Sequence, residues 1–165
     1  MPKYRLETLL EIRERAEEEA KQAFSVAMKA LHQEKESLKK LEDDLARRKA
    51  ERKAKVQAYL AEVMKKGVGA GNINQMNTFE NRLKDEEAQV GLEIEKQKEA
   101  VRQAEQFLEV KRAEMADAAK EKKAIEKHKE NWAKEVKKER DQKEELNQEE
   151  IGNTLHLQRV RREGQ

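Results

Sequence analysis

The chain has 165 residues, of which 44% are charged and only 4% are aromatic, and its 37 basic and 35 acidic side chains leave a net charge of +2. This composition excludes an ordinary globular core, because too few large apolar side chains are present, and it is typical of a coiled coil. The near balance of charge gives no general indication of nucleic-acid or membrane binding, and the absence of cysteine excludes disulfide and thiolate chemistry.

The first predicted element is one long helix, because no glycine or proline occurs from Lys3 to Lys66. Its seam, read at alternating steps of four and three, consists of Leu6, Leu10, Arg13, Glu17, Ala20, Phe24, Ala27, Leu31, Glu34, Leu38, Leu41, Leu45, Arg48, Arg52, Lys55 and Tyr59. The seam is charged from Arg48 to Lys55 and becomes apolar again at Val56, Tyr59 and Val63. A period near 3.5 indicates a left-handed coiled coil.

A turn is predicted next, because Gly67, Gly69 and Gly71 can adopt the positive φ values that a chain reversal needs. Asn72 is expected to cap the second helix, with Gln75 as its capping-box partner. The same glycines lack the Gly-Lys-Ser/Thr order of a phosphate-binding loop, so we interpret the segment as a turn only.

The second predicted helix has a matching seam. It consists of Leu83, Glu87, Val90, Ile94, Gln97, Val101, Ala104, Leu108, Lys111, Met115, Ala118, Lys122, Ile125, Lys129, Trp132 and Val136. Folding back at the glycines brings Trp132 close to Leu6, Leu9 and Leu10, and we expect it to pack there. Gly152 and Asn153 are expected to stop the helix, which leaves a flexible tail.

The predicted fold class is therefore all-α, with two long helices forming an antiparallel coiled-coil hairpin. We expect one elongated domain over residues 1–165, with a first arm at about 4–66, a turn at about 67–72, a second arm at about 73–151 and a tail at 152–165. The pattern leaves open whether the hairpin is a monomer or pairs with a second copy.

Nothing in the sequence indicates catalysis, a cofactor or a metal site. His32, His128 and His156 are too far apart for a local metal motif, and we interpret them as helix-surface residues. The basic block from Arg47 to Lys55 lacks interleaved aromatic residues, so a solvated face is favoured over a nucleic-acid site. We expect neither nucleic-acid binding nor membrane insertion, because no apolar run approaches the length of a membrane span. The N-terminus also lacks the apolar region of a signal peptide, which favours the cytoplasm.

Two end segments resemble a known family. The residues from Tyr4 to Arg13 (YRLETLLEIR) resemble the opening of FliJ/YscO proteins, and those from Glu126 to Glu135 (EKHKENWAKE), leading to His156, resemble YscO-type injectisome members more closely. The resemblance implies a non-catalytic central stalk of a type III secretion apparatus, located in the cytoplasm beside the inner membrane. Its implied partners are the secretion ATPase hexamer, the cytoplasmic domain of the export gate and secretion chaperones.

The resemblance also implies two contact regions. The open end of the hairpin is expected to contact the ATPase through Arg5, Leu6, Leu9, Arg13, Arg15, Glu135, Lys138, Arg140, Arg159 and Arg161. The tip is expected to contact the export gate through Val56, Tyr59, Val63, Phe79 and Leu83. Two alternatives stay open: a coiled-coil adaptor that escorts secretion chaperones, and a nucleic-acid binder that uses the basic block.

Overall fold

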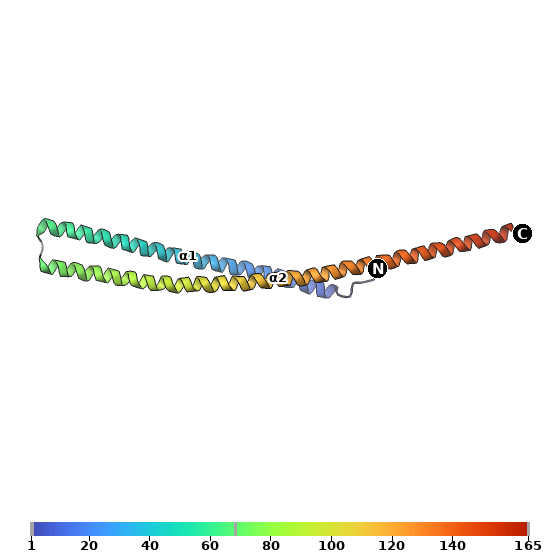
Figure 1. The fold of residues 1–165 in the computed structure, drawn as a ribbon, viewed down its shortest axis with the longest axis horizontal. Helices are drawn as coiled ribbons and strands as arrows, with labels where there is room; N and C mark the ends of the chain where they lie inside the picture. Colours follow the sequence, from blue (N-terminus) through green and yellow to red (C-terminus); the bar gives the residue numbers. More distant parts are fainter. Residues whose placement is uncertain (1, 68, 165) are drawn as a thin grey trace. The chain divides into compact units, whose positions relative to one another are not determined.

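The computed structural model describes residues 2–67 and 69–164, and the fold consists of two long helices (Figure 1). Helix α1 spans Glu7–Lys66 and helix α2 spans Ala70–Glu163. The described part of the chain contains no β-strand. The two helices run antiparallel and contact each other, which confirms the predicted all-α hairpin.

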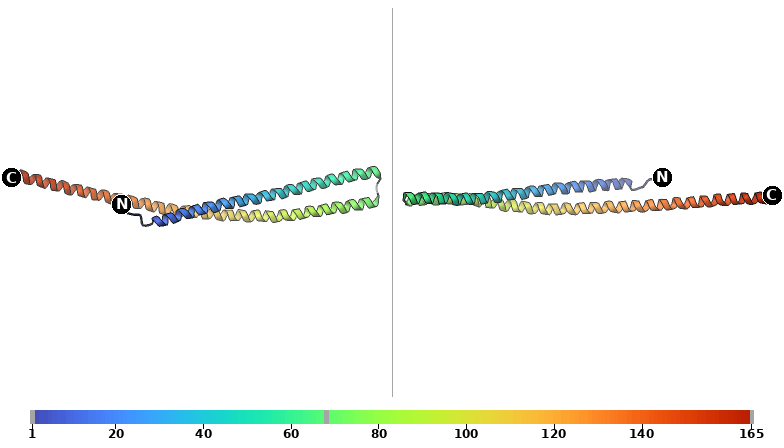
Figure 2. Two further views of the ribbon diagram at one scale, coloured as in Figure 1. Left: turned by 180° about the vertical axis from the view of Figure 1, so that it is seen from behind. Right: turned by 90° about the horizontal axis from the view of Figure 1, so that it is seen from above.

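Contacts divide the chain into two compact units. The terminal unit comprises residues 2–20 and 115–164, and the turn unit comprises residues 21–114. Each unit contains a segment of α1 and a segment of α2. Within the turn unit the two segments lie side by side up to the chain reversal (Figure 1 and Figure 2). The interpretation of the chain as one elongated domain stays a prediction.

Helix α1 begins three residues later than the predicted arm. The Glu7 amide donates to the carbonyl of Tyr4 at 3.3 Å and the Leu10 amide to that of Leu6 at 2.9 Å, so residues 4–6 form the turn that starts the helix. At the other end, Lys65 and Lys66 lie in the last turn, where positive charge favours the helix dipole. Gly67 then adopts φ of 89°, the left-handed conformation that glycine accepts most readily after a helix.

Helix α2 begins earlier than predicted, and the proposed cap at Asn72 is wrong. The Gly69 carbonyl accepts the amides of Asn72 at 3.1 Å and Ile73 at 3.4 Å, so Gly69 is the residue that precedes the helix. Glycine is an acceptable residue at this position. Gly71 lies inside the helix, because Gly69 already precedes the first helical residue. A single glycine within a helix lowers the free energy of unfolding by only about 1 kcal/mol relative to alanine.

The predicted helix stop at residues 152–153 is also wrong, because α2 continues to Glu163. Gly152 has no positive φ, and no proline follows it to enforce a break. The Thr154 hydroxyl donates to the Glu150 carbonyl at 2.8 Å, which bridges the predicted break. Every side chain from 137 to 164 is exposed, and residues 152–163 continue the helix rather than forming an irregular tail.

Burial follows the predicted seam closely in both units. On α2 every predicted position is buried or half-buried, and on α1 the one exception is Lys55, whose neighbour Val56 is half-buried instead. Ala27 is the most buried residue, at 2% exposure. Val90, Ile94 and Val101 complete the buried apolar positions of the turn unit. Because the seam is narrow, each seam residue buries little apolar surface and contributes only a small part of the free energy that holds the two helices together.

An ion pair occupies the seam of the turn unit. Arg52 Nε lies 2.7 Å from Glu87 Oε1, and Arg52 Nη1 lies 3.5 Å from Glu80 Oε1. The Arg52 and Glu87 side chains are only 15% and 9% exposed. Farther along the same seam, the Gln97 amide donates to the Glu34 backbone carbonyl at 2.9 Å and to the Glu34 carboxylate. A buried polar pair matches only one alignment of the helices, so these contacts fix the register.

Tyr4 attaches the residues before α1 to α2 within the terminal unit. Its side chain is buried, its hydroxyl oxygen lies 2.6 Å from His128 Nδ1, and its ring centroid lies 5.2 Å from that of Trp132. Lys129 pairs with Glu7 at 2.8 Å beside the ring. The expected neighbours of Trp132 were leucines. The sequence interpretation did not identify Tyr4 as its aromatic partner, because Tyr4 precedes the periodic segment.

Replacing Arg52 with alanine should destabilise the protein by about 2–4 kcal/mol, because the buried Glu87 carboxylate would lose its partner. Urea denaturation followed by circular dichroism measures this change. Arg47→Ala is the matched control, since Arg47 is 61% exposed and pairs with Asp44 and Glu51 of its own helix. Equal losses for the two variants would contradict the role given to the seam pair.

Replacing Tyr4 with alanine should expose Trp132, the only tryptophan, and shift its fluorescence emission to longer wavelength. The expected loss of stability is about 2–3 kcal/mol, from the removed ring contacts. Tyr4→Phe is the control, because it keeps the ring and removes only the hydrogen bond to His128. An unchanged emission spectrum for Tyr4→Ala would contradict this packing.

Candidate partner-binding surfaces

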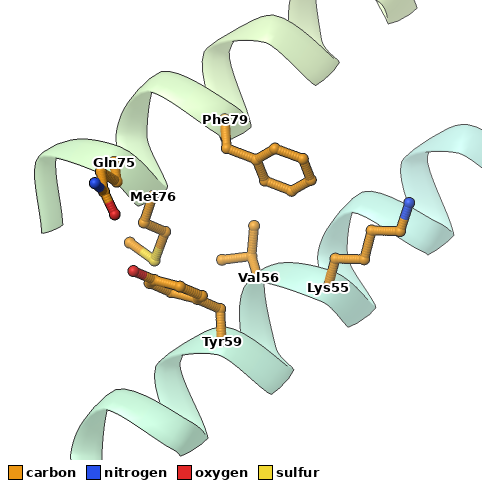
Figure 3. A pocket seen from close by; sticks show the side chains of 6 residues that line it. All are labelled: Lys55, Val56, Tyr59, Gln75, Met76 and Phe79. Atoms are coloured by element: carbon orange, nitrogen blue, oxygen red, sulfur yellow. The ribbon is translucent and has the colours of Figure 1, made fainter. Parts of the chain in front are cut away.

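An apolar pocket lies between α1 and α2 next to the chain reversal, and we refer to it as the turn pocket (Figure 3). Its volume is about 360 Å³, enough for one large side chain. It is lined by Lys55, Val56, Tyr59, Gln75, Met76 and Phe79. Figure 3 shows the side chains of Val56, Tyr59, Met76 and Phe79 gathered between the two helices.

The turn pocket arises from the spacing of its residues. Val56 and Tyr59 are three positions apart on α1, and Met76 and Phe79 are three apart on α2, so each pair lies on one helix face. The Tyr59 hydroxyl donates to the Asn72 carbonyl at 3.1 Å, which fixes the ring against the first turn of α2. Met76 is unbranched and flexible, so this wall can adapt to the shape of an occupant.

Apolar and basic residues surround the turn pocket. Met64, Leu60 and Ile73 are exposed at 80%, 42% and 42%, and they extend the apolar surface toward the chain reversal. The Arg82 guanidinium lies 5.5 Å above the Phe79 ring, and Lys55 lines the pocket itself. An apolar occupant with acidic neighbours matches this chemistry.

Three of the five residues predicted for the tip line the turn pocket: Val56, Tyr59 and Phe79. Leu83 instead lines an adjoining hollow of about 110 Å³, whose walls are mainly charged and include Arg52 and Glu87. Val63 is half-buried nearer the turn and lines neither hollow. Gln75 and Met76 were not among the predicted residues, although the three-residue spacing of Met76 and Phe79 could have indicated Met76.

The residues predicted for the open end all lie in the terminal unit, but they differ in exposure. Leu6, Leu9 and Arg13 are half-buried. Arg13 Nη1 pairs with Glu121 of α2, so this guanidinium already has a structural partner. The exposed members are Arg5, Arg15, Glu135, Lys138, Arg140, Arg159 and Arg161.

The structure brings only part of this set to one place. Arg140 lines a hollow of about 300 Å³ together with Pro2, Val136, Glu139 and Lys143. Arg159 and Arg161 lie on the part of α2 in which every side chain is exposed. The terminal unit therefore presents an open, mixed-charge helix surface rather than a single enclosed site.

The resolved pKa shifts belong to surface ion pairs. The hydrogen bond from Lys129 to Glu7 raises the pKa of the Lys129 ammonium. Hydrogen bonds from Arg47 and Arg48 lower the pKa of the Asp44 carboxyl, and Lys134 lowers that of Glu130. Each shift favours the charged form, which is the behaviour of structural ion pairs and not of a general acid with a raised pKa.

The histidines are separated in the structure as well. His32 Nε2 lies 3.0 Å from Glu36 of the same helix, and His128 contacts Tyr4. Among the described residues, no group of three or more His, Asp or Glu side chains is placed to hold a metal ion. No helix in the described ranges is long and apolar enough to cross a membrane.

Comparison with known proteins agrees with this architecture. The solved structure of a protein described as a YscO homolog, CT670 from Chlamydia trachomatis, has a TM-score of 0.80 and 29% sequence identity. The match covers 94% of this chain and 96% of that one. Comparison with curated proteins gives no match. The family model for YscO-like proteins matches residues 1–162. With nearly its whole length matched, this chain belongs to the YscO-like family.

Proposed function

We propose that this chain is the non-catalytic central stalk of a type III secretion export apparatus. In this proposal the terminal unit associates with the hexameric secretion ATPase, and the turn pocket contacts the cytoplasmic domain of the export gate. Membership of the YscO-like family makes the chain a type III secretion-associated protein. The individual contacts are inferred from the chemistry of the two units.

The observation that carries the ATPase contact is the helical segment 137–163 of α2, in which every side chain is exposed. A helix whose side chains are all exposed buries no apolar surface against the rest of the chain, so tertiary packing contributes little to its stability. This segment also carries charge of both signs. Long charged side chains can exchange their ion pairs with the inner wall of a ring. A large apolar surface would instead hold the helix in one position and prevent it from moving within the ring. This segment therefore suits insertion into an oligomeric ring.

The gate contact is supported by the turn pocket. Its apolar walls and basic neighbours make it chemically different from the terminal unit. A separate surface of different character allows a second partner to bind without displacing the first. The same pocket also suits a secretion chaperone, so an adaptor that escorts chaperones is the second candidate function.

Charge reversal at Arg5 and Arg15 together should weaken association with the cognate secretion ATPase about tenfold and reduce any stimulation of ATP hydrolysis. Both side chains are exposed, so the helical content should not change. Arg13 is unsuitable for this test, because its loss would also break the pair with Glu121. Lys39→Glu with Lys40→Glu, two exposed residues of the turn unit, form the charge-matched control. Full binding by the double variant would remove Arg5 and Arg15 from the ATPase contact.

Replacing Phe79 with alanine should weaken binding of the export-gate cytoplasmic domain at least tenfold, because Phe79 is a large side chain in the turn pocket. Calorimetry with the purified domain measures the affinity. Leu92→Ala, an exposed apolar residue outside the pocket, is the control. If a secretion chaperone loses affinity while the gate domain does not, the adaptor function is the better assignment.

A further inference from the structure

One face of the turn unit consists of uncharged residues over about four turns of α1 and three of α2, and we refer to it as the neutral face. One cation borders it, because Lys111 Nζ lies 5.1 Å from the centroid of the Phe107 ring. The neutral face comprises Ala23, Val26, Ala30, Gln33 and Ser37 of α1 and Ala100, Gln103, Phe107 and Val110 of α2. Ala23 and Ala100 are half-buried and the others are exposed. Val26, Phe107 and Val110 are 66%, 52% and 53% exposed. Such a run is unusual in a chain that is 44% charged.

Contacts between the helices show that both halves lie on the same side of the seam. Arg48 pairs with Asp44 at 3.0 Å on its own helix and with Glu86 at 3.6 Å on α2, so Asp44 and Glu86 flank the same side. In a coiled coil, positions seven residues apart share a flank. Ala23, Ala30 and Ser37 precede Asp44 by multiples of seven, and Ala100 and Phe107 follow Glu86 by multiples of seven.

The opposite flank at the same height is charged and already occupied. Lys35 Nζ lies 3.9 Å from Glu105, and the Arg112 guanidinium lies 5.8 Å from the Phe24 ring centroid. Met28 precedes Lys35 by seven residues and so lies on this charged flank. The two flanks therefore differ sharply in character along the same stretch of helix.

The shape of the neutral face is self-complementary. Its α1 half presents the small residues Ala23 and Ala30 on either side of Val26, whereas its α2 half carries the large residues Phe107 and Val110 beside Ala100. A two-fold axis parallel to the helices places α1 of one copy against α2 of the other. Phe107 of each copy then lies over the two alanines of its partner, as a knob fits a hole.

Charge also favours a second copy as the occupant. In this parallel arrangement, charged residues of one copy lie level with the same residues of the other copy along the helix axis. Repulsion between the two copies is therefore smallest along the neutral face, whose residues are uncharged. The neutral face ends where charge returns, at Glu19 and Glu114 on one side and at Lys40 and Lys96 on the other. We propose that the neutral face is the contact surface of a parallel two-fold homodimer, which pairs two hairpins into a four-helix assembly.

The size of the neutral face limits the strength of this dimer. Residues 23–37 extend over about 21 Å at 1.5 Å per residue, which gives a contact at the small end of specific interfaces. Association should therefore be weak and concentration-dependent, with the dimer appearing between about 10 µM and 1 mM. This inference does not depend on the proposed stalk function, because it involves neither the ATPase nor the export gate.

Sedimentation equilibrium of the full chain tests the proposal. The wild-type protein should show a monomer–dimer equilibrium, and Val26→Glu should weaken it at least tenfold by placing two like charges in the contact. Val26 is well exposed, so this variant should keep its helical content by circular dichroism. Met28→Glu is the control on the opposite flank and should dimerise like wild type. A wild-type monomer at every concentration, or equal loss in both variants, would overturn the proposal.

Disulfide cross-linking tests the orientation of the two copies. Because the chain has no native cysteine, a cross-link can form only between the introduced cysteines. In the parallel arrangement Ala30 of one copy faces Gln103 of the other. A mixture of the single variants Ala30→Cys and Gln103→Cys should therefore form a mixed cross-linked dimer under mild oxidation, whereas neither variant should do so efficiently alone. Efficient cross-linking of Ala30→Cys with itself would indicate an antiparallel pairing and would refute the arrangement proposed.

Discussion

The pairing of α1 with α2 along one narrow seam is the constraint on which the rest of the structure depends. A two-helix protein has no second layer, so a residue is either at the seam or largely in water. Apolar seam positions supply most of the attraction, but repeated apolar residues alone would tolerate a slip of one heptad. The buried Arg52–Glu87 pair and the Gln97–Glu34 hydrogen bonds oppose that slip, because each would lose its partner.

The seam was predictable from sequence because it depends on periodicity, the most reliable signal in a chain of this composition. The predicted positions are buried or half-buried even where they are charged, as at Arg48 and Lys122. The exception at Lys55 is instructive. Burying the neighbouring Val56 is more favourable than burying a lysine, so Val56 takes the place of Lys55 at the seam. The heptad spacing of the seam positions before and after it does not change.

The helix ends were harder to predict because they depend on single residues and local competition. Asn72 has the side chain of a cap, yet Gly69 precedes the helix because the chain has already reversed. Gly152 looks like a stop, but one glycine among helix-forming neighbours is not enough to end α2. Tyr4 lies outside any periodic pattern, so its contacts with His128 and Trp132 could only be found in three dimensions.

The candidate surfaces follow from the same constraint. Because each helix buries only one stripe, the remaining surface is free to vary, and it does so in three chemically distinct ways. The segment 137–164 is wholly exposed and mixed in charge, the turn pocket is apolar with basic neighbours, and the neutral face is formed by uncharged residues. Charged side chains are costly to desolvate, so an uncharged or apolar surface offers a partner more free energy on binding than the charged surface around it. The turn pocket shows why sequence alone located it only in part: Val56 and Tyr59 fit the seam pattern, and only the folded pair shows that the space between them and Phe79 is left open.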